Sequence, residues 1–334
     1  MKRLQLEDLS KQLGYSKTLI SMVLNSKGDQ YGISKKTQAF VLDAAAKLNY
    51  APNRFAKALR MGKSNFIGLI LPDINNFFYS AIAKSIENTL SEQGYNLIVR
   101  STDENEEKEK MLVNMMLNQH DVDGLIIASA FKSAVFYEQS PYSKIPIVFI
   151  DRILPLFQAH YVIMDNHGGA YEIVNHVIKT GYKKIICFSH AASVSDIEDC
   201  LNGYKDAIEK NKLTYNEGCI KIIRCENTEE DIEKTLRDMI NANTEPDAIF
   251  ALNNRIAIIL LKVLKKKEFE KISKVKIACF GDNEIFNFVE NPVISISQPV
   301  QEIGKDASLL ILDVISGKQM HKSNIVLATT LIVR

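Results

Sequence analysis

The chain lacks the features that define several classes of protein. Its 334 residues include only 8 prolines and no low-complexity tract, so the composition is that of a folded globular protein. Its longest apolar run, around IAIILL, is far shorter than the ~20 residues that a membrane span requires. The first residues, MKRLQLEDLS, carry charges where a signal peptide needs an apolar stretch. We therefore expect a cytoplasmic protein with no membrane partner.

Signatures of disulfide, metal and catalytic sites are missing as well. The five cysteines form an odd number without a CxxC pair, and the six histidines show no HExxH or other ligand spacing. No GxGxxG, GxxxxGKS/T or GxSxG pattern occurs. Ser273 and Lys276 match SxxK by letter, but they lie in a charged segment that leads into a strand, so chance accounts for them. The sequence predicts no enzyme, no cofactor and no metal site.

Charge is distributed unevenly along the chain, although the formal net charge is only +1. Residues 1–63 carry 12 basic and 4 acidic residues, a net charge of +8, whereas the remainder carries 29 basic and 36 acidic residues, a net charge of −7. A small basic segment joined to a large acidic one is typical of proteins whose small segment binds a polyanion. The length also predicts two or three packing units.

The first 48 residues predict three short helices with one small core. Leu6, Leu9 and Leu13 follow helical spacing, and Ser16 and Ser34 are suitable N-caps for a second and a third helix. On the second helix, the apolar side chains fall within one arc of roughly 140° and small polar groups fill the opposite face. The apolar set is Leu19, Ile20, Val23 and Leu24, and the other face carries Lys17, Thr18, Ser21, Met22 and Asn25. A merely solvated surface helix is the alternative interpretation.

Residues 49–63 predict a hinge helix and linker. Pro52 breaks the preceding helix, and Asn53 can cap a helix of one to two turns that runs through Arg60. Such a short helix does not recover its nucleation cost alone, so we expect it to become ordered only when a partner binds.

From Phe66 onward, short apolar runs alternate with longer amphipathic stretches, which is typical of an α/β fold with parallel sheets. Eight runs predict two lobes of four strands each, with helices between them. The runs are residues 66–73, 95–103, 123–130, 145–152, 183–190, 219–225, 246–254 and 275–282. Polar residues follow several of these strands, namely Asp73, Asp103, Asp151, Asn253 and Asp282. Because ligands bind at the carboxyl ends of such strands, we expect a cleft between the lobes to collect these side chains.

Eight blocks of the sequence occur in this order: LQLEDLSKQLGYSKTLISMVLN, NRFAKALR, IGLILPDINNFF, DVDGLII, IPIVFIDR, MDNHGGAYE, PDAIFALNN and SQPVQEIG. Together they resemble the LacI/GalR family of bacterial transcription regulators. The resemblance implies a helix-turn-helix headpiece (1–48), a hinge helix and linker (49–63), and an effector-binding, dimerising core like the periplasmic binding proteins (64–334). Its amino-terminal lobe would span about 64–163 plus 297–325, and its carboxyl-terminal lobe about 164–296 plus 326–334.

The resemblance also implies which residues contact DNA. Lys17, Thr18 and Met22 would read base edges, and Leu59 would be a minor-groove wedge unless it only packs in the linker. Most relatives have arginine at the position of Met22, so a thymine-methyl contact replaces a guanine contact here. The implied DNA-binding set is Leu6, Ser16, Lys17, Thr18, Ser21, Met22, Asn25, Ser34, Thr37, Tyr50, Asn53, Ala56, Leu59 and Arg60.

A second implied set binds a small-molecule effector. Cys200 stands where sugar-binding relatives usually have arginine, and its alternative role is filling the core. Asp282 has the alternative role of capping a helix, and Arg152 would suit a carboxylate or phosphate. The implied effector-binding set is Asn76, Phe78, Asp151, Arg152, Cys200, Asn253, Asp282 and Gln298.

The sequence therefore predicts a homodimeric regulator that binds a near-palindromic site in double-stranded DNA under the control of a sugar-like effector. Repression is preferred over activation, but the regulatory sense, the operator and the effector stay open. The competing interpretations are a solute-binding protein without a DNA role and a sugar-modifying enzyme. The first lacks an export signal and the second lacks a catalytic pair.

Overall fold

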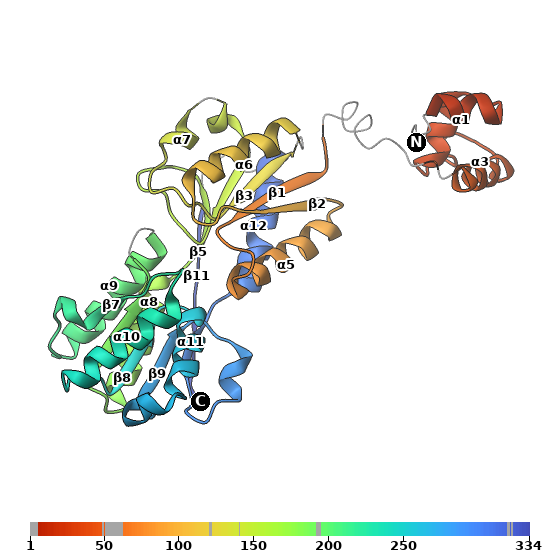
Figure 1. The fold of residues 1–334 in the computed structure, drawn as a ribbon. Helices are drawn as coiled ribbons and strands as arrows, with labels where there is room; N and C mark the ends of the chain where they lie inside the picture. Colours follow the sequence, from red (N-terminus) through yellow and green to blue (C-terminus); the bar gives the residue numbers. More distant parts are fainter. Residues whose placement is uncertain are drawn as a thin grey trace. The chain divides into compact units, whose positions relative to one another are not determined.

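A computed structural model of the chain describes residues 6–48, 50, 63–119, 122–139, 141–191, 195–318, 321 and 323–334. The chain folds into two compact units, which we call the headpiece unit (Met1–Asn65) and the core unit (Phe66–Arg334) (Figure 1). The predictions for Asn53, Ala56, Leu59 and Arg60, and for the hinge helix that contains them, lie outside the described residues.

The headpiece unit contains three helices, α1 (Leu6–Leu13), α2 (Lys17–Leu24) and α3 (Lys35–Lys47). Both predicted N-caps are confirmed, because Ser16 Oγ accepts a hydrogen bond from Leu19 N and Ser34 Oγ accepts one from Thr37 N, each at 3.2 Å. Gly14 ends α1 with a left-handed φ of 71°, a conformation that glycine adopts without strain, and the chain turns directly into α2.

A small apolar cluster holds these three helices together. Its buried members come from every helix and are Leu9, Ile20, Val23, Val41 and Ala45. Eight partly buried residues surround them: Leu6, Leu13, Tyr15, Leu19, Leu24, Ile33, Leu48 and Tyr50. A core of this size supplies only a few kcal/mol of net stability, so the headpiece unit depends on each buried side chain.

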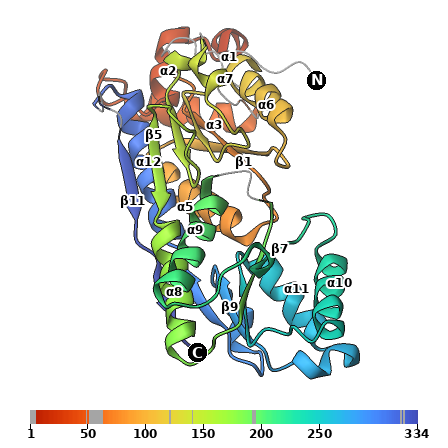
Figure 2. The ribbon, with the colours of Figure 1, turned by 90° about the vertical axis from the view of Figure 1, so that its left-hand side faces the viewer.

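The core unit consists of two six-stranded sheets, one in each lobe (Figures 1 and 2). The sheet of the amino-terminal lobe, in the order β11-β5-β4-β3-β1-β2, contains β1 (Phe66–Leu71), β2 (Asn96–Ser101), β3 (Gly124–Ile127), β4 (Ile147–Ile150), β5 (His160–Met164) and β11 (Asn324–Leu327). The sheet of the carboxyl-terminal lobe, in the order β12-β10-β9-β8-β6-β7, contains β6 (Ile185–Ser189), β7 (Ile220–Ile222), β8 (Ala248–Ala251), β9 (Lys276–Phe280), β10 (Ile294–Ser297) and β12 (Thr330–Ile332). Every described pairing is parallel except that of β10 with β12.

Helices cover both faces of each sheet, as the strands' nearly continuous apolar sequences require. In the amino-terminal lobe, α5 (Phe77–Glu92) and α12 (Val300–Ile315) cover one face, and α6 (Glu106–Gln119) and α7 (Val135–Glu138) cover the other. In the carboxyl-terminal lobe, α8 (Asn166–Lys179) and α9 (Ser195–Lys210) lie opposite α10 (Thr228–Asn241) and α11 (Asn254–Leu264). Four short 3-10 helices complete the described elements: η1 (Tyr142–Lys144), η2 (Glu217–Cys219), η3 (Lys267–Ile272) and η4 (Glu284–Asn287).

The chain passes between the lobes three times, from β5 to α8, from β10 to α12 and from β11 to β12. These crossings lie near the lobe limits predicted from the sequence. The exact residues at which each lobe begins and ends stay a prediction. The predicted fold class is confirmed, but the prediction of four strands per lobe is wrong. The four missed strands, β5, β10, β11 and β12, are three to five residues long and supply edge or crossover positions. No helix in the described parts of the chain is long and apolar enough to span a membrane.

Leu9→Ala tests how far the headpiece unit depends on its small core. Leu9 is completely buried, so the cavity should cost about 2–4 kcal/mol, which is comparable to the whole stability of such a unit. Calorimetry of the full-length protein should show the headpiece transition lowered or lost and the core transition unchanged. Leu42→Ala is the matched control, because Leu42 is 50% exposed on α3 and its removal should change neither transition. Equal effects of the two substitutions would contradict the argument.

Candidate functional site

The polar face of α2 is the first candidate site. Lys17 and Thr18 are exposed, and Ser21, Met22 and Asn25 are half-buried. Lys17 Nζ lies 3.0 Å from Glu7 Oε2, and this ion pair with Lys17 lowers the pKa of Glu7. The thioether of Met22, on the same face, is only partly exposed. The face offers one cation and several short hydrogen-bonding groups, the set that contacts base edges and phosphates.

Two of the residues predicted to contact DNA, Ser16 and Ser34, are the N-cap serines themselves. Ser16 and Ser34 accept backbone hydrogen bonds through Oγ, and this leaves the hydroxyl proton of Ser16 available for an external acceptor. Asn25 Nδ2 instead donates to the carbonyl of Ser21 at 2.7 Å. Ser34 Oγ also lies 2.9 Å from Thr37 Oγ1, so these two predicted contacts form one polar group at the start of α3. The remaining predicted residues here, Leu6 and Tyr50, pack against the headpiece core.

A loop that sequence reasoning did not resolve fixes the end of α2 relative to α3. Asp29 accepts hydrogen bonds from Lys35 Nζ at 2.7 Å and from Gln38 Nε2 at 2.9 Å. Gln38 Nε2 also donates to the carbonyl of Ile33 at 2.7 Å. A Cβ atom on Gly28 would lie only 2.4 Å from Gln38 Cδ, so the loop packs closely on this side chain. These contacts therefore hold the loop in a fixed conformation between α2 and α3.

The second candidate site lies where strands of the core unit end. Asp151 and Arg152 follow β4, as predicted, and Asp151 is 3% and Arg152 5% exposed. The hydroxyl of Tyr79, on α5, donates to Asp151 Oδ2 at 2.7 Å. Arg152 donates through Nη1 and Nη2 to the two carboxylate oxygens of Glu104, each at 2.8 Å. From the other lobe, Asp196 Oδ1 lies 3.4 Å from Arg152 Nε.

One guanidinium is thus surrounded by three carboxylates, and this charge balance controls the pKa values. Burial, together with the charge of Asp196, raises the pKa of Asp151 to about 7, although Arg152 and Tyr79 oppose the shift. Burial also raises the pKa of Asp196. Sequence reasoning missed Tyr79, Glu104 and Asp196. Glu104 follows the predicted strand-end residue Asp103 directly, which was the available signal.

A buried carboxylate behind this cluster positions the loop that Arg152 contacts. Glu109 accepts hydrogen bonds from Ser129 Oγ at 2.7 Å, from Ala130 N at 2.6 Å and from the Tyr137 hydroxyl. Ser129 in turn presents its carbonyl to Arg152 Nη1 at 3.0 Å. Both terminal nitrogens of Arg152 are therefore occupied within the protein. This arrangement weakens the interpretation that Arg152 receives an effector carboxylate or phosphate.

The other predicted effector residues have separate structural roles. Asn76 caps α5 and Asn253 caps α11, and Phe78 is buried with its ring 5.1 Å from that of Tyr79. Cys200 is 4% exposed within the main core cluster, and burial raises the pKa of its thiol. The structure therefore places Cys200 in the core, as the alternative interpretation has it.

Asp282 does not cap a helix, so that alternative is wrong. Asn283 caps η4, and Asp282 Oδ1 accepts hydrogen bonds from Ser295 Oγ at 2.7 Å and Arg334 Nη2 at 2.8 Å. Arg334 also donates to Asn287 Oδ1 at 2.7 Å. Sequence reasoning missed Arg334, because nothing local links it to Asp282.

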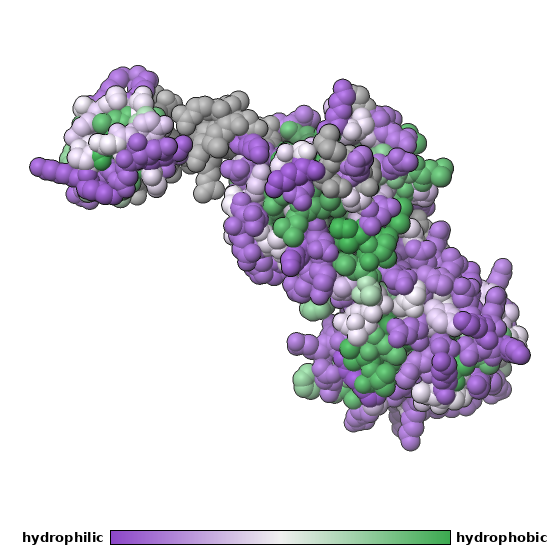
Figure 3. Space-filling view, turned by 180° about the vertical axis from the view of Figure 1, so that it is seen from behind, coloured by the Kyte–Doolittle hydropathy of each residue, from purple (hydrophilic) through white to green (hydrophobic). Residues whose placement is uncertain are grey.

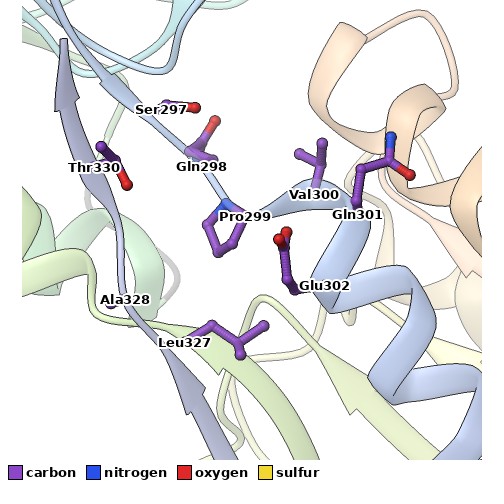
Figure 4. Close-up of a pocket in the computed structure, with 9 residues that line it drawn as sticks. All are labelled: Ser297, Gln298, Pro299, Val300, Gln301, Glu302, Leu327, Ala328 and Thr330. Carbon is purple, nitrogen blue, oxygen red and sulfur yellow. The ribbon is translucent and has the colours of Figure 1, made fainter.

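Gln298 lies on the segment that crosses from β10 to α12. Its Nε2 lies 3.7 Å from Met164 Sδ, and the residue lines an open pocket of about 460 Å3 between two segments that connect the lobes. Figure 4 shows the lining side chains arriving from both segments. They are Ser297, Gln298, Pro299, Val300, Gln301, Glu302, Leu327, Ala328 and Thr330.

Comparison with known proteins identifies the family. Residues 64–333 match the family model described as periplasmic binding proteins and sugar binding domain of LacI family. The HTH-type transcriptional regulator DegA of Bacillus subtilis is 29% identical over 330 residues, which cover 98% of this chain and 96% of that protein. The fructose operon regulatory protein of Vibrio cholerae is 29% identical over 309 residues, covering 92% of this chain and 93% of that protein.

A solved structure extends the similarity of fold over the whole chain. The Lac repressor dimer bound to operator and the anti-inducer ONPF has a TM-score of 0.84 at 21% identity and covers 100% of this chain and 98% of that chain. DegA is named as a transcriptional regulator and the Vibrio cholerae protein as a regulatory protein, which confirms the prediction of a regulator rather than an enzyme. The chain therefore belongs to the LacI family of transcriptional regulators, with a DNA-binding headpiece and an effector-binding core of two parallel-sheet lobes.

Proposed function

We propose that this regulator is a cytoplasmic homodimeric repressor, which binds a near-palindromic operator through α2 and releases or retains it according to a sugar-type effector. The polar face of α2 is the observation that carries the proposal. It presents Lys17, Thr18 and Met22 from a helix whose opposite face is anchored by buried Ile20 and Val23. The net charge of +8 on residues 1–63 supports contact with phosphates.

Two copies would place two such helices in successive major grooves. Exposed apolar side chains of the core unit support association of copies, since large exposed apolar patches mark interaction sites. Figure 3 shows hydrophobic side chains on both lobes of one face, within a surface that is mainly hydrophilic. Among the described residues of the core unit as a whole, the large hydrophobic side chains that are more than half exposed are Phe77, Met111, Val135, Leu156, Ile222, Phe288, Val326 and Val333.

The chemistry of the core favours a neutral, hydroxyl-rich effector over an anionic one. Glu104 and the Ser129 carbonyl occupy both terminal nitrogens of Arg152, and Asp151 and Asp196 add negative charge beside it. Carboxylates accept hydrogen bonds from hydroxyl groups and repel phosphates. The Vibrio cholerae relative is named for a fructose operon, which supports a carbohydrate as the effector class.

Lys17→Met tests the role of α2 in reading the operator. Loss of a base contact should weaken operator binding by about 1–3 kcal/mol, roughly tenfold or more, and reduce discrimination against unrelated DNA. Lys11→Met is the matched control, because Lys11 also pairs with Glu7, at 3.7 Å, but lies on α1. Fluorescence anisotropy with an operator selected from genomic fragments gives both affinities. Equal losses in the two variants would show only a general effect of charge.

Salt dependence tests whether phosphates dominate the affinity. Between 50 and 200 mM salt, a protein that makes several phosphate contacts should lose about 100-fold or more in affinity, because counterions are released on binding. The same titration on a chain lacking residues 1–63 should show no DNA retention. A salt-insensitive interaction, or full retention by the shortened chain, would favour a solute-binding protein without a DNA role.

Paired ligands test the effector class. A neutral sugar that binds the core should raise the thermal midpoint of the full-length protein by several degrees at saturation, since ligand binding stabilises the folded state. The phosphate ester of the same sugar should give a smaller rise, because it meets Asp151 and Asp196 without a free guanidinium. A larger rise with the ester would contradict this choice and restore Arg152 as an anion site.

A further inference from the structure

The two lobes meet at a pair of contacts beside the Asp151 and Arg152 cluster. Arg152 Nε lies 3.4 Å from Asp196 Oδ1, and the backbone N–H of Ile153 donates to Ser195 Oγ at 2.9 Å. Arg152 and Ile153 follow β4 of the amino-terminal lobe, whereas Ser195 and Asp196 begin α9 of the carboxyl-terminal lobe. Two consecutive residues of one lobe thus contact two consecutive residues of the other, although each lobe is built on its own sheet.

The contact differs from an ordinary surface ion pair. The side chain of Arg152 is only 6% exposed and that of Asp196 is 21% exposed, so water screens their attraction poorly. Glu104 and the Ser129 carbonyl hold the guanidinium in one orientation. Among the described residues, neither Arg152 Nε nor Asp196 Oδ1 has a hydrogen-bond partner. The contacts left to Nε are charge contacts, at 3.4 Å with Asp196 Oδ1 across the lobes and at 3.9 Å with Asp151 Oδ2 in the same lobe. Asp151 has a left-handed φ of 68°, a strain that the surrounding contacts must maintain.

We propose that Arg152, Ile153, Ser195 and Asp196 form a latch that holds the two lobes together before any effector binds. Separation of the lobes would expose a buried guanidinium and break one backbone hydrogen bond, so the latch opposes opening. An effector that favours the open arrangement must overcome it, and one that favours the closed arrangement adds to it. The effect of the latch on DNA binding rests on the proposed function. The latch itself is a property of the core unit and does not.

The strength of the latch depends on protonation of Asp151. The charged and titratable groups that face Asp151 are Tyr79 on α5, Glu104 after β2, Arg152 beside it and Asp196 on α9. Burial raises the pKa of Asp151 to about 7. Below that pH the carboxyl is neutral and Arg152 is left to Glu104 and Asp196. Above it, a second buried negative charge faces Asp196. Closure therefore takes up a proton, and the latch weakens as pH rises through about 6 to 8.

Hydrogen exchange of the full-length protein measures the latch directly, because the Ile153 amide is one of its hydrogen bonds. Exchange rates are divided by the intrinsic rate at each pH, which gives a protection factor. Asp196→Asn should lower the protection of Ile153 by about threefold to tenfold and flatten its dependence on pH. Ser195→Ala, which removes only the hydroxyl acceptor, should also lower it. Protection in the unaltered protein should fall between pH 6 and pH 8.

Asp206→Asn is the matched control on the same helix. Asp206 pairs with His167 at 2.8 Å, with both side chains about half exposed, so its substitution should leave Ile153 protection unchanged. If Asp196→Asn prevents folding, Ser195→Ala alone decides the question. Unchanged protection in the variants that fold would overturn the latch. Anisotropy measurements on the same samples separate this failure from failure of the proposed function, because loss of the latch leaves operator binding by the headpiece detectable.

Discussion

Parallel strand pairing is the constraint on which the rest of the core unit depends. Consecutive parallel strands require a crossover along the face of the sheet, and repeated crossovers bring the carboxyl ends of the strands to one edge. In each lobe that edge carries polar residues, among them Asp151 and Arg152 after β4. The backbone beyond a buried strand is free to turn, so polar side chains meet there without interrupting the sheet. The candidate effector site and the latch both follow from this placement.

Burial of charged groups at the strand ends determines which ligands they can bind and how the lobes can move. A guanidinium that is nearly inaccessible to water must be paired, and Glu104 supplies that partner from an exposed turn. The pairing affects ligand recognition, because an arginine that is already paired with Glu104 is not available to bind an anionic ligand. It also affects movement of the lobes, because one of the other charge contacts of Arg152, that with Asp196, crosses between the lobes. Specificity and conformational control therefore have the same physical origin in this protein.

The sequence predicted the fold class, most helices and both headpiece N-caps, because these depend on local patterns. Capping serines and apolar periodicity are visible within a few residues. It predicted Asp151 and Arg152 for the same reason, as residues that end an apolar strand. It could not predict the partners of these residues. Asp196 lies 44 positions from Arg152 in the chain, and Arg334 lies 52 positions from Asp282. Such pairs are fixed by tertiary packing, which no local pattern records.

The uneven charge of the chain gives the two units opposite electrostatic effects on DNA. Residues 1–63 carry a net charge of +8 and the remainder carries −7, so the core unit repels the same phosphates that attract the headpiece unit. Nonspecific binding is mainly electrostatic, and an acidic core suppresses it everywhere except at the headpiece. Affinity is thereby confined to the unit that also has the weakest core and the fewest buried side chains. A partner that orders or repositions the headpiece unit therefore changes DNA affinity. The large acidic core unit regulates this binding without contacting DNA.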